Sequence, residues 1–298
     1  MKSIRSKLNR LLKLSVALVF YLCTEVRNAI GRSAKRTPSA TCVVLHYHGI
    51  RPEHRLLFAA QMDALKRLTT PIPADYKTPL AAGQHYAIVT FDDGFSTVVE
   101  NAVPELVRRR IPATIFVVSD LLGATPTWDS LGHDYILREQ LISAEQLQGL
   151  PVDLIRVGSH GLSHQFLPSV SEEQARNELS ESRKKLSDIL STEITLFSFP
   201  YGAFNNRLIE LCRAAGYKRA FTILPSLALK DPQELVTGRI AVEPTDWALE
   251  FRLKLLGAYR WLPSAFALKQ VLFSFLSIKQ KAAYAPEENG IMRTREWL

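Results

Sequence analysis

Seven short apolar runs, separated by stretches with helical patterns, make up much of the sequence between residues 42 and 242. The runs are rich in β-branched and aromatic residues and are bounded by Gly, Pro or Asp, which is typical of buried strands. They lie at residues 42–48, 87–91, 113–118, 154–159, 195–200, 219–223 and 239–242. Strands that alternate with helices form a mainly parallel sheet, and this spacing fits a closed or nearly closed α/β barrel.

Two of the intervening helices carry clear end signals. Residues 171–190 open with the sequence SEEQ, in which Ser171 and Gln174 have the pattern of a capping box. Residues 204–215 are followed by Gly216, the residue expected at the left-handed position after a helix. Both helices fall between predicted strands, where a parallel sheet needs its crossover connections.

The predicted organisation has three parts. The barrel is expected to span residues 38–250, after a basic and apolar segment at 1–37 and before a C-terminal helical extension and tail at 251–298. Within the barrel, residues 120–150 are longer than a simple crossover and are predicted to form either a lid or an irregular connection. This segment contains Trp128, Asp129 and His133.

The positive charge of the chain is confined to its N-terminus. The net charge is +8, and residues 1–36 contain nine Lys or Arg and one acidic residue. The rest of the chain holds 28 basic and 28 acidic residues and is therefore neutral. A nucleic-acid enzyme spreads basic residues over a binding face, so no nucleic-acid partner is expected. A basic arm of this kind instead suits an anionic membrane surface.

An apolar run, LSVALVFYLC, lies inside this arm from Leu14 to Cys23. Its ten residues are fewer than the roughly 20 that a helix needs to cross a bilayer. Three interpretations remain: a secretory signal with a poor cleavage site, a signal anchor or interfacial helix, or a first helix packed on the domain. We expect membrane association, at a bacterial inner membrane with its side undetermined, and a secreted or periplasmic product as the alternative.

Residues able to carry chemistry gather where the predicted strands end. The C-terminal ends of parallel strands meet at one rim of a barrel, so these side chains are expected to lie close together. They are His46 and His48 at the end of the first run, Asp92 and Asp93 after the second, His160 and His164 after the fourth, and Pro200, Tyr201 and Gly202 at the end of the fifth.

The pattern from His160 to His164 suits a metal site, because two imidazoles one helical turn apart can reach the same ion. A carboxylate as third ligand leaves a position for water, whose pKa a divalent ion can lower to roughly 7. Of the two adjacent acids, one is then needed as a ligand, and its neighbour can accept the proton of the water. Gly94 allows the backbone to turn so that both acids face the rim.

The motifs TFDDGF, GSHGLSH and FSFPYG, in this order, resemble those of the polysaccharide deacetylases of carbohydrate esterase family 4. The group includes the nodulation chitooligosaccharide deacetylase, and the resemblance runs from about residue 41 to about residue 247. It implies a distorted (β/α)7 barrel that removes acetyl groups from N-acetylated sugars. The implied roles are Asp92 as base, Asp93, His160 and His164 as metal ligands, and the turn Pro200-Tyr201-Gly202 as oxyanion donor and aromatic wall.

This sequence departs from the family pattern in two places. Many members carry an arginine where this chain has Ser198, and many use a late histidine as general acid, whereas no histidine follows His164. A subgroup of exopolysaccharide and poly-N-acetylglucosamine deacetylases lacks the late histidine and has Tyr-His near the first strand. The sequence LHYHGI is similar to that subgroup, and by this resemblance His48 is the acid.

Three late residues are candidates for supporting roles. Arg239, at the start of the seventh run, is predicted to replace the missing arginine. Asp246 and Trp247 resemble the late Asp-Trp motif of the family, although there is no late histidine for them to orient.

The predicted function is therefore a metal-dependent hydrolase acting on an N-acetylated polysaccharide or lipid-linked glycan, with residues 1–36 at a membrane surface. Zinc is the first choice of ion, with cobalt or nickel as alternatives. A second hypothesis is a barrel that has lost catalysis and binds glycan at the membrane, motivated by Ser198 and the missing late histidine. A third is an iron oxygenase, because two histidines and one carboxylate also bind iron.

Overall fold

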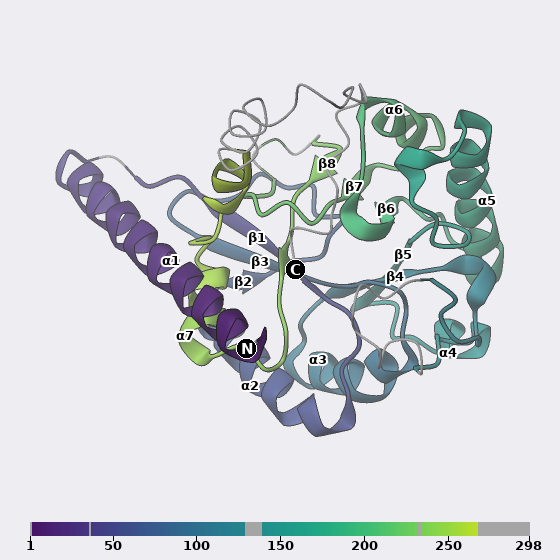
Figure 1. Cartoon of the computed structure of the whole chain (residues 1–298), viewed down its shortest axis with the longest axis horizontal. Helices are drawn as coiled ribbons and strands as arrows, with labels where there is room; N and C mark the ends of the chain where they lie inside the picture. Colours follow the sequence, from purple (N-terminus) through teal and green to yellow (C-terminus); the bar gives the residue numbers. More distant parts are fainter. Residues whose placement is uncertain (1, 36, 129–138, 230, 232–233, 268–298) are drawn as a thin grey trace.

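The computed structural model describes residues 2–35, 37–128, 139–229, 231 and 234–267 (Figure 1). The strands are β1 (Thr41–Tyr47), β2 (Thr70–Pro71), β3 (His85–Phe91), β4 (Ala113–Val117), β5 (Ile155–Ser159), β6 (Leu196–Ser198), β7 (Arg219–Phe221), β8 (Val236–Thr237) and β9 (Ile240–Ala241). The α-helices are α1 (Lys2–Ser33), α2 (Arg55–Leu68), α3 (Val103–Arg109), α4 (Ala144–Gln148), α5 (Glu172–Leu190), α6 (Asn206–Ala214) and α7 (Ala248–Leu255).

The strands form one parallel sheet in the order β8-β7-β6-β5-β4-β3-β1-β9, with β2 paired to β3. Its edge strands β8 and β9 are separated in the chain by Gly238 and Arg239, so the sheet curls until its two edges come close. The predicted parallel α/β barrel is confirmed, and all seven predicted strands are present. β2 and β8 were not predicted, because strands of two residues leave no periodic pattern.

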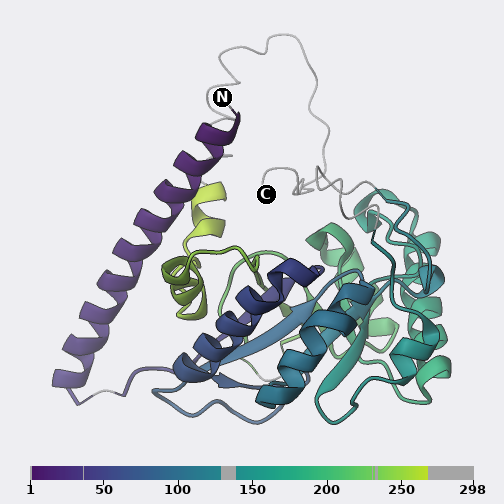
Figure 2. The same ribbon diagram turned by 90° about the horizontal axis from the view of Figure 1, so that it is seen from below.

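The helices pack around the outside of this curled sheet (Figures 1 and 2). Both predicted helix signals are found in the structure. Ser171 and Gln174 make the reciprocal bonds of a capping box before α5, and Gly216 adopts a φ of +91° just after α6.

Because successive side chains of a strand point to opposite faces of the sheet, two separate apolar clusters form. Val43 and Leu45 of β1 join the core between sheet and helices, whereas Cys42 and Val44 join a second cluster with Ile88, Phe116 and Phe221 from other strands. This second cluster fills the inside of the barrel. The inward-facing positions further along the same strands, toward the C-terminal ends, are polar.

The N-terminal arm differs from the prediction in its length. The apolar run Leu14–Cys23 is part of α1, a continuous helix of 32 residues. By length and composition, its segment Lys7–Ser33 could cross a membrane. Figures 1 and 2 show α1 along one edge of the molecule, next to α7. The sequence prediction counted only the purely apolar residues, whereas a helix continues through the flanking Lys and Arg, which are good helix formers.

The predicted boundary at residue 250 falls inside α7. Phe251, Leu253 and Leu255 of this helix are at most 2% exposed and belong to the core between sheet and helices. Most of the second apolar stretch of the predicted extension, and the tail, lie outside the described residues. So do Asp129 and His133 of the predicted lid, whereas Trp128 is described.

Candidate functional site

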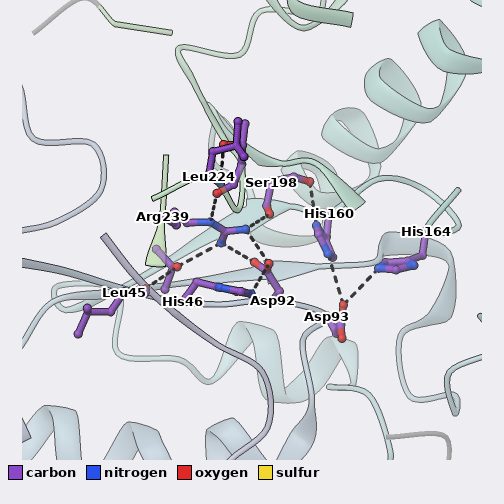
Figure 3. Close-up of polar contacts among 11 residues, drawn as sticks. Leu45, His46, Asp92, Asp93, His160, His164, Ser198, Leu224 and Arg239 are labelled. Atoms are coloured by element: carbon purple, nitrogen blue, oxygen red, sulfur yellow. Dashed lines mark hydrogen bonds and ion pairs between the residues drawn. The ribbon is translucent and has the colours of Figure 1, made fainter. Parts of the chain in front are cut away.

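The structure brings five predicted site residues together at the C-terminal rim of the barrel (Figure 3). Asp92 and Asp93 follow β3, His160 follows β5, and His164 lies in the loop after it. Arg239 reaches them from between β8 and β9. Asp92 lies among the polar groups of the inner barrel wall, and Asp93 faces the imidazoles of His160 and His164.

Asp93 and the two histidines form a compact donor set. Oδ1 of Asp93 lies 3.3 Å from Nε2 of His160 and 3.3 Å from Nε2 of His164. Among the described residues, these three are the one group of His, Cys, Asp or Glu whose ligand atoms all lie within 4.8 Å of one another. All three side chains are at least 95% buried. Two imidazole nitrogens and one carboxylate oxygen facing one point fit a divalent metal ion.

Electrostatics favour the charged form of this carboxylate. Burial alone would raise the pKa of Asp93, but the hydrogen bonds with His160 and His164 outweigh burial and hold the pKa well below its usual range. The carboxyl group of Asp93 is therefore ionised beside the two imidazoles. An anionic oxygen beside two imidazoles is the charge state that a cation requires of its ligands.

The backbone reaches this geometry through unusual torsions. Asp93 and Gly94 have φ values of +69° and +77°, so the turn after β3 passes through the left-handed region. A Cβ at Gly94 would also lie 3.3 Å from Val117 on the neighbouring strand. His164 has a φ of +63°. A non-glycine residue at positive φ costs free energy and is concentrated at functional sites.

The structure corrects the predicted reason why the two histidines converge. Residues 160–166 are not helical, and Gly161 and His164 both have positive φ. The loop is held instead by Glu178 of α5, whose Oε2 accepts the backbone N–H groups of Leu162 and Ser163 at 2.8 and 3.0 Å. Glu178 is 6% exposed and was not singled out in the sequence, because its position in the middle of α5 resembled that of a solvated helix residue.

The second ring nitrogens of the two histidines have different surroundings. Nδ1 of His160 lies 2.8 Å from the Ser198 carbonyl oxygen, which orients the ring so that Nε2 faces Asp93. Nδ1 of His164 is buried and has no hydrogen-bond partner among the described residues. Its ring is instead stacked on Trp128, with centroids 4.1 Å apart, and meets Tyr201 edge-on at 4.7 Å.

Asp92 is held by a buried arginine. Arg239 is 0% exposed, and its two terminal nitrogens donate to Oδ1 and Oδ2 of Asp92, both at 2.7 Å. The same guanidinium donates to Ser198 Oγ at 2.8 Å and to the Thr222 carbonyl at 3.1 Å. Ser198 occupies the position where an arginine was expected, and Arg239 brings a guanidinium to that place from another strand.

The charge of Asp92 follows from this pairing. Burial would raise the pKa of Asp92, but the Arg239 guanidinium, with smaller contributions from His160 and His46, holds the pKa well below its usual range. A bidentate arginine also fixes the plane of the carboxylate. Asp92 is therefore an oriented anion next to the donor set formed around Asp93.

The two histidines of the first strand lie beside Asp92. His46 is 4% exposed, and its Nε2 is 3.7 Å from Oδ2 of Asp92. Burial, followed by the positive charge of Arg239, lowers the pKa of His46 well below its usual range, so this imidazole is neutral. The ring of His48 meets that of His46 edge-on, with centroids 4.9 Å apart. His48 is only partly buried, which leaves it the more accessible of the two.

The turn Pro200-Tyr201-Gly202 lies beside His164, whose ring meets that of Tyr201 edge-on. Tyr201 has a φ of +58°, and Gly202 has a φ of +64° in a place where a Cβ would overlap Ile223. The N–H of Gly202 donates to the Phe199 carbonyl at 2.8 Å. The Tyr201 ring lies 6.0 Å from that of Phe166, so aromatic side chains line this side of the site.

Asp246 and Trp247 contact a different part of the molecule. Oδ2 of Asp246 accepts a hydrogen bond from Lys254 of α7 at 2.6 Å, and Oδ1 lies 3.5 Å from Arg10 of α1. The Arg10 guanidinium is centred 4.4 Å from the Trp247 ring. These contacts join the loop after β9 to α1 and α7.

Comparisons with known proteins relate the chain to one family. Residues 81–220 match the family model described as polysaccharide deacetylase. The chain is 27% identical over 157 residues to YxkH of Bacillus subtilis, whose name places it with the polysaccharide deacetylases. It is 26% identical over 164 residues to the poly-beta-1,6-N-acetyl-D-glucosamine N-deacetylase of Staphylococcus epidermidis. These alignments cover 53% and 52% of this chain, and 51% and 53% of the relatives, so the chain spans about half the length of each.

A solved structure extends the comparison to the fold. IcaB from Ammonifex degensii superposes with a TM-score of 0.61 at 24% sequence identity, over 74% of this chain and 98% of that chain. This likeness supports the barrel architecture. The family match contains Asp92, Asp93, His160, His164 and Tyr201, and it ends before Arg239.

Proposed function

Because the chain carries a polysaccharide deacetylase domain, we propose that it is a metal-dependent hydrolase that removes N-acetyl groups from a glycan. The single observation that carries this proposal is the arrangement of two neighbouring acids with separate partners. Asp93 faces the two histidines at 3.3 Å, and Asp92 faces an arginine at 2.7 Å. Amide hydrolysis at neutral pH needs a site for an activating cation and a separate base, and this arrangement supplies both.

Asp93, His160 and His164 are the proposed ligands of one divalent ion, with zinc as the first choice and cobalt or nickel as alternatives. When bound, such an ion supplies a Lewis acid that lowers the pKa of water to about 7 and polarises the carbonyl group. The chain contributes preformed ligands, since His160 is already oriented by the Ser198 carbonyl.

Asp92 is the proposed general base. It accepts one proton from the attacking water as the bond between the water oxygen and the acetyl carbon forms. Arg239 keeps this carboxylate ionised and in one orientation, although a low pKa makes it a weak base. A weak base suffices where the acidity of the attacking water is raised, since proton transfer depends on the difference between the two pKa values.

His48 is the proposed general acid. The bond between the acetyl carbon and the sugar nitrogen breaks as His48 gives a proton to that nitrogen, so that a free amine and acetate result. The negative charge that develops on the carbonyl oxygen needs a donor, and we assign the backbone N–H of Tyr201 to this role. The assignment rests on the resemblance of the turn Pro200-Tyr201-Gly202 to the family motif. A donor of this kind contributes about 3–4 kcal/mol in the transition state.

We further propose that the substrate is an N-acetylated exopolysaccharide or lipid-linked glycan at a bacterial inner membrane. The relative named for poly-beta-1,6-N-acetyl-D-glucosamine supports an amino-sugar polymer. The aromatic side chains Trp128, Tyr201 and Phe166 suit the apolar faces of sugar rings. The apolar helix α1 supports a location at the membrane.

The proposal is tested by a deacetylation screen on the metal-loaded full chain. Chitooligosaccharides, poly-N-acetylglucosamine fragments and lipid-linked N-acetylated sugars are supplied, and released acetate and free amine are measured with zinc, cobalt or nickel and with a chelator. We expect equal amounts of acetate and amine from at least one substrate, loss with chelator and recovery on adding metal.

One outcome of this screen would favour the second hypothesis, a glycan-binding barrel without catalysis. Glycan binding without acetate release, in protein shown to contain the metal, would support the glycan-binding barrel instead. The structure removes one motive for that alternative, since Arg239 brings a guanidinium to Ser198 and Asp92.

A further inference from the structure

The late motif Asp246-Trp247 contacts the N-terminal helix. Nε of Arg10 donates to Oε2 of Glu250 at 2.7 Å, and Nη2 donates to the Thr245 carbonyl at 3.2 Å. The guanidinium also lies 3.5 Å from Asp246 and 4.4 Å from the centre of the Trp247 ring. Arg10 thus binds two carboxylates, a carbonyl and an aromatic face at once. We call this set of contacts the Arg10 latch.

The acidic partners of the latch, Asp246 and Glu250, are buried carboxylates that need positive charge nearby. The side chains of Asp246 and Glu250 are 6% and 9% exposed, while that of Arg10 is 32% exposed. Lys254 of α7 pairs with both acids, at 2.6 and 3.5 Å. Arg10 and Lys13, both on α1, bring further positive charge to these two carboxylates. The latch therefore favours the docked position of α1.

The contact continues along one stripe of α1. Leu14, Ala17 and Tyr21 follow Arg10 at helical spacing; Ala17 is 0% exposed, and Leu14 and Tyr21 pack against the main core. Arg260 lies over the ring of Phe20 at 5.3 Å. These residues form a seam from Arg10 to Tyr21, so α1 is a packed element of the molecule over this length.

The opposite face of α1 is apolar and exposed. Nine of the fifteen large exposed hydrophobic side chains found among the described residues lie on this helix. They are Leu8, Leu11, Leu12, Val16, Leu18, Val19, Leu22, Val26 and Ile30. Between residues 8 and 26 no exposed position of α1 is charged, and Arg10, Lys13 and Glu25 all lie on partly covered positions. A solvated helix face would carry charges, so this face is suited to an apolar medium.

We propose that the Arg10 latch holds α1 on the barrel while the opposite apolar face lies in the interface of an anionic lipid bilayer. The charge of the chain supports this partner, because residues 1–36 carry nine basic residues and one acid while the rest is neutral. Basic residues flanking an apolar helix face bind anionic headgroups. The loop of the latch follows β9, whose end belongs to the rim with the site, so the latch places the mouth of the barrel beside the membrane.

The docked helix is too short to span the bilayer. The hydrocarbon core is about 30 Å thick, and a helix rises about 1.5 Å per residue. The seam occupies residues Arg10–Tyr21 against a water-exposed body, and the remaining residues 22–33 of the helix cover about 18 Å. A spanning α1 would therefore have to break the seam and expose the buried acids of the latch.

The native cysteines offer a probe for this geometry. Cys23 is exposed on α1, whereas Cys42 and Cys212 are buried. An environment-sensitive fluorophore on Cys23 of the full chain, loaded from detergent onto vesicles, reports contact with lipid. We expect a blue-shifted emission and at least about tenfold tighter binding to vesicles with one third anionic lipid than to purely zwitterionic ones.

The depth of the fluorophore in the bilayer distinguishes an interfacial helix from a spanning one. Nitroxide lipids labelled near the headgroups should quench it more than lipids labelled at the bilayer centre, because an interfacial helix sits only about 5–10 Å deep. Stronger quenching from the bilayer centre would show a spanning helix and overturn the proposal. So would absence of any lipid response, or a concentration-dependent blue shift without lipid, which would show pairing with a second copy.

Matched variants test the latch and the face separately. Arg10→Ala should speed hydrogen exchange across residues 10–21 at least about tenfold, whereas Arg32→Ala, an exposed arginine on the same helix, should not. Equal exchange in both variants would contradict the latch. Val19→Asp should weaken vesicle binding at least tenfold, and Val152→Asp, at an exposed valine on the barrel, should not.

The inference rests on the proposed function only for its purpose, which is to hold a deacetylase beside membrane-borne glycans. None of these lipid and exchange measurements requires turnover. Release of acetate from soluble chitooligosaccharides is measured on the same protein without vesicles. Failure of the membrane proposal and failure of the deacetylase proposal are therefore recognised independently.

Discussion

The two halves of the site are built on different principles. In the Asp92 half, Arg239 donates to both carboxylate oxygens at 2.7 Å, so the chain itself balances the buried charge. In the Asp93 half, one anionic carboxylate faces two imidazoles, and His164 has a buried ring nitrogen with no partner among the described residues. The first half is complete as folded, while the second offers three ligand atoms to a cation.

This difference supports the proposal of separate roles for the two adjacent acids. A carboxylate engaged by a bidentate arginine is oriented but has little freedom to become a metal ligand. A carboxylate at positive φ, turned away from that arginine, is available for an ion. Variants that alter one half at a time test this difference.

The largest effect is expected for Asp92→Asn. The amide keeps the shape of the side chain but cannot accept the proton of the attacking water, so turnover should fall by roughly 10³–10⁴-fold, the upper part of the range for general bases. Metal content should stay at the wild-type level. Residual turnover within tenfold of wild type would assign the base elsewhere.

The next effect is expected for His48→Ala. Without a proton donor the amine leaves poorly, and turnover should fall by roughly 10²–10³-fold with the metal still bound. The matched control is His85→Ala, which removes a histidine at the start of β3, away from the rim. Near-normal turnover in the His48 variant would show that another group protonates the leaving nitrogen.

Arg239→Met should act mainly on stability. Removing one partner of a buried ion pair leaves an uncompensated charge on Asp92 and should lower the free energy of unfolding by about 3–5 kcal/mol. Arg219→Met is a control, because this arginine is also buried but lies at the start of β7, at the other end of the barrel. Turnover per folded molecule should drop only in the Arg239 variant.

The pH dependence of this difference is a sharper test of the pairing. The folded-state pKa of Asp92 is depressed, so the stability that the pair contributes is fully present above the unfolded-state pKa of about 3.9 and is lost as pH falls toward the folded-state value. The gap in unfolding free energy between wild type and Arg239→Met should therefore be largest near neutral pH and shrink as the pH falls, because buried Asp92 without its arginine takes up a proton more readily in the variant. A gap that grows in acid would contradict the pairing.

A smaller effect is expected for Trp128→Ala. The Trp128 ring is stacked on His164, whose Nδ1 has no hydrogen bond among the described residues to orient it. Loss of this packing should weaken metal affinity by about tenfold, the lower end of the range for residues that orient ligands. Trp128→Phe should retain most of the affinity. Competition with a chelating dye measures both variants, and equal loss in both would show that stacking is not the cause.

The fold was predictable from the sequence because parallel strands leave compact apolar runs and their crossover helices leave cap signals. Ser171 and Gln174 defined the start of α5 in this way. The four acids and histidines Asp92, Asp93, His160 and His164 could be placed at one rim because the ends of parallel strands share an edge. These predictions depend only on local pattern and topology.

The parts that were not predictable depend on backbone torsions and distant pairings. The HGLSH segment was expected to be a helical turn, and its actual shape depends on positive φ values and on Glu178, more than ten residues away. Arg239 was predicted to replace the missing arginine, but no local pattern indicates its pairing with Ser198, 41 residues earlier in the chain. The length of α1 does not follow from its apolar run alone, because the helix continues through the basic residues on both sides.

The most direct measurement of the central claim is the metal content of two matched variants, Asp93→Asn and Asp92→Asn, each loaded with zinc, freed of excess ion and compared with wild type. The account predicts about one ion per chain in wild type and in Asp92→Asn, and less than about a tenth of that in Asp93→Asn. Full zinc content in Asp93→Asn, or equal loss in both variants, would contradict the division of the site into a base half and a metal half.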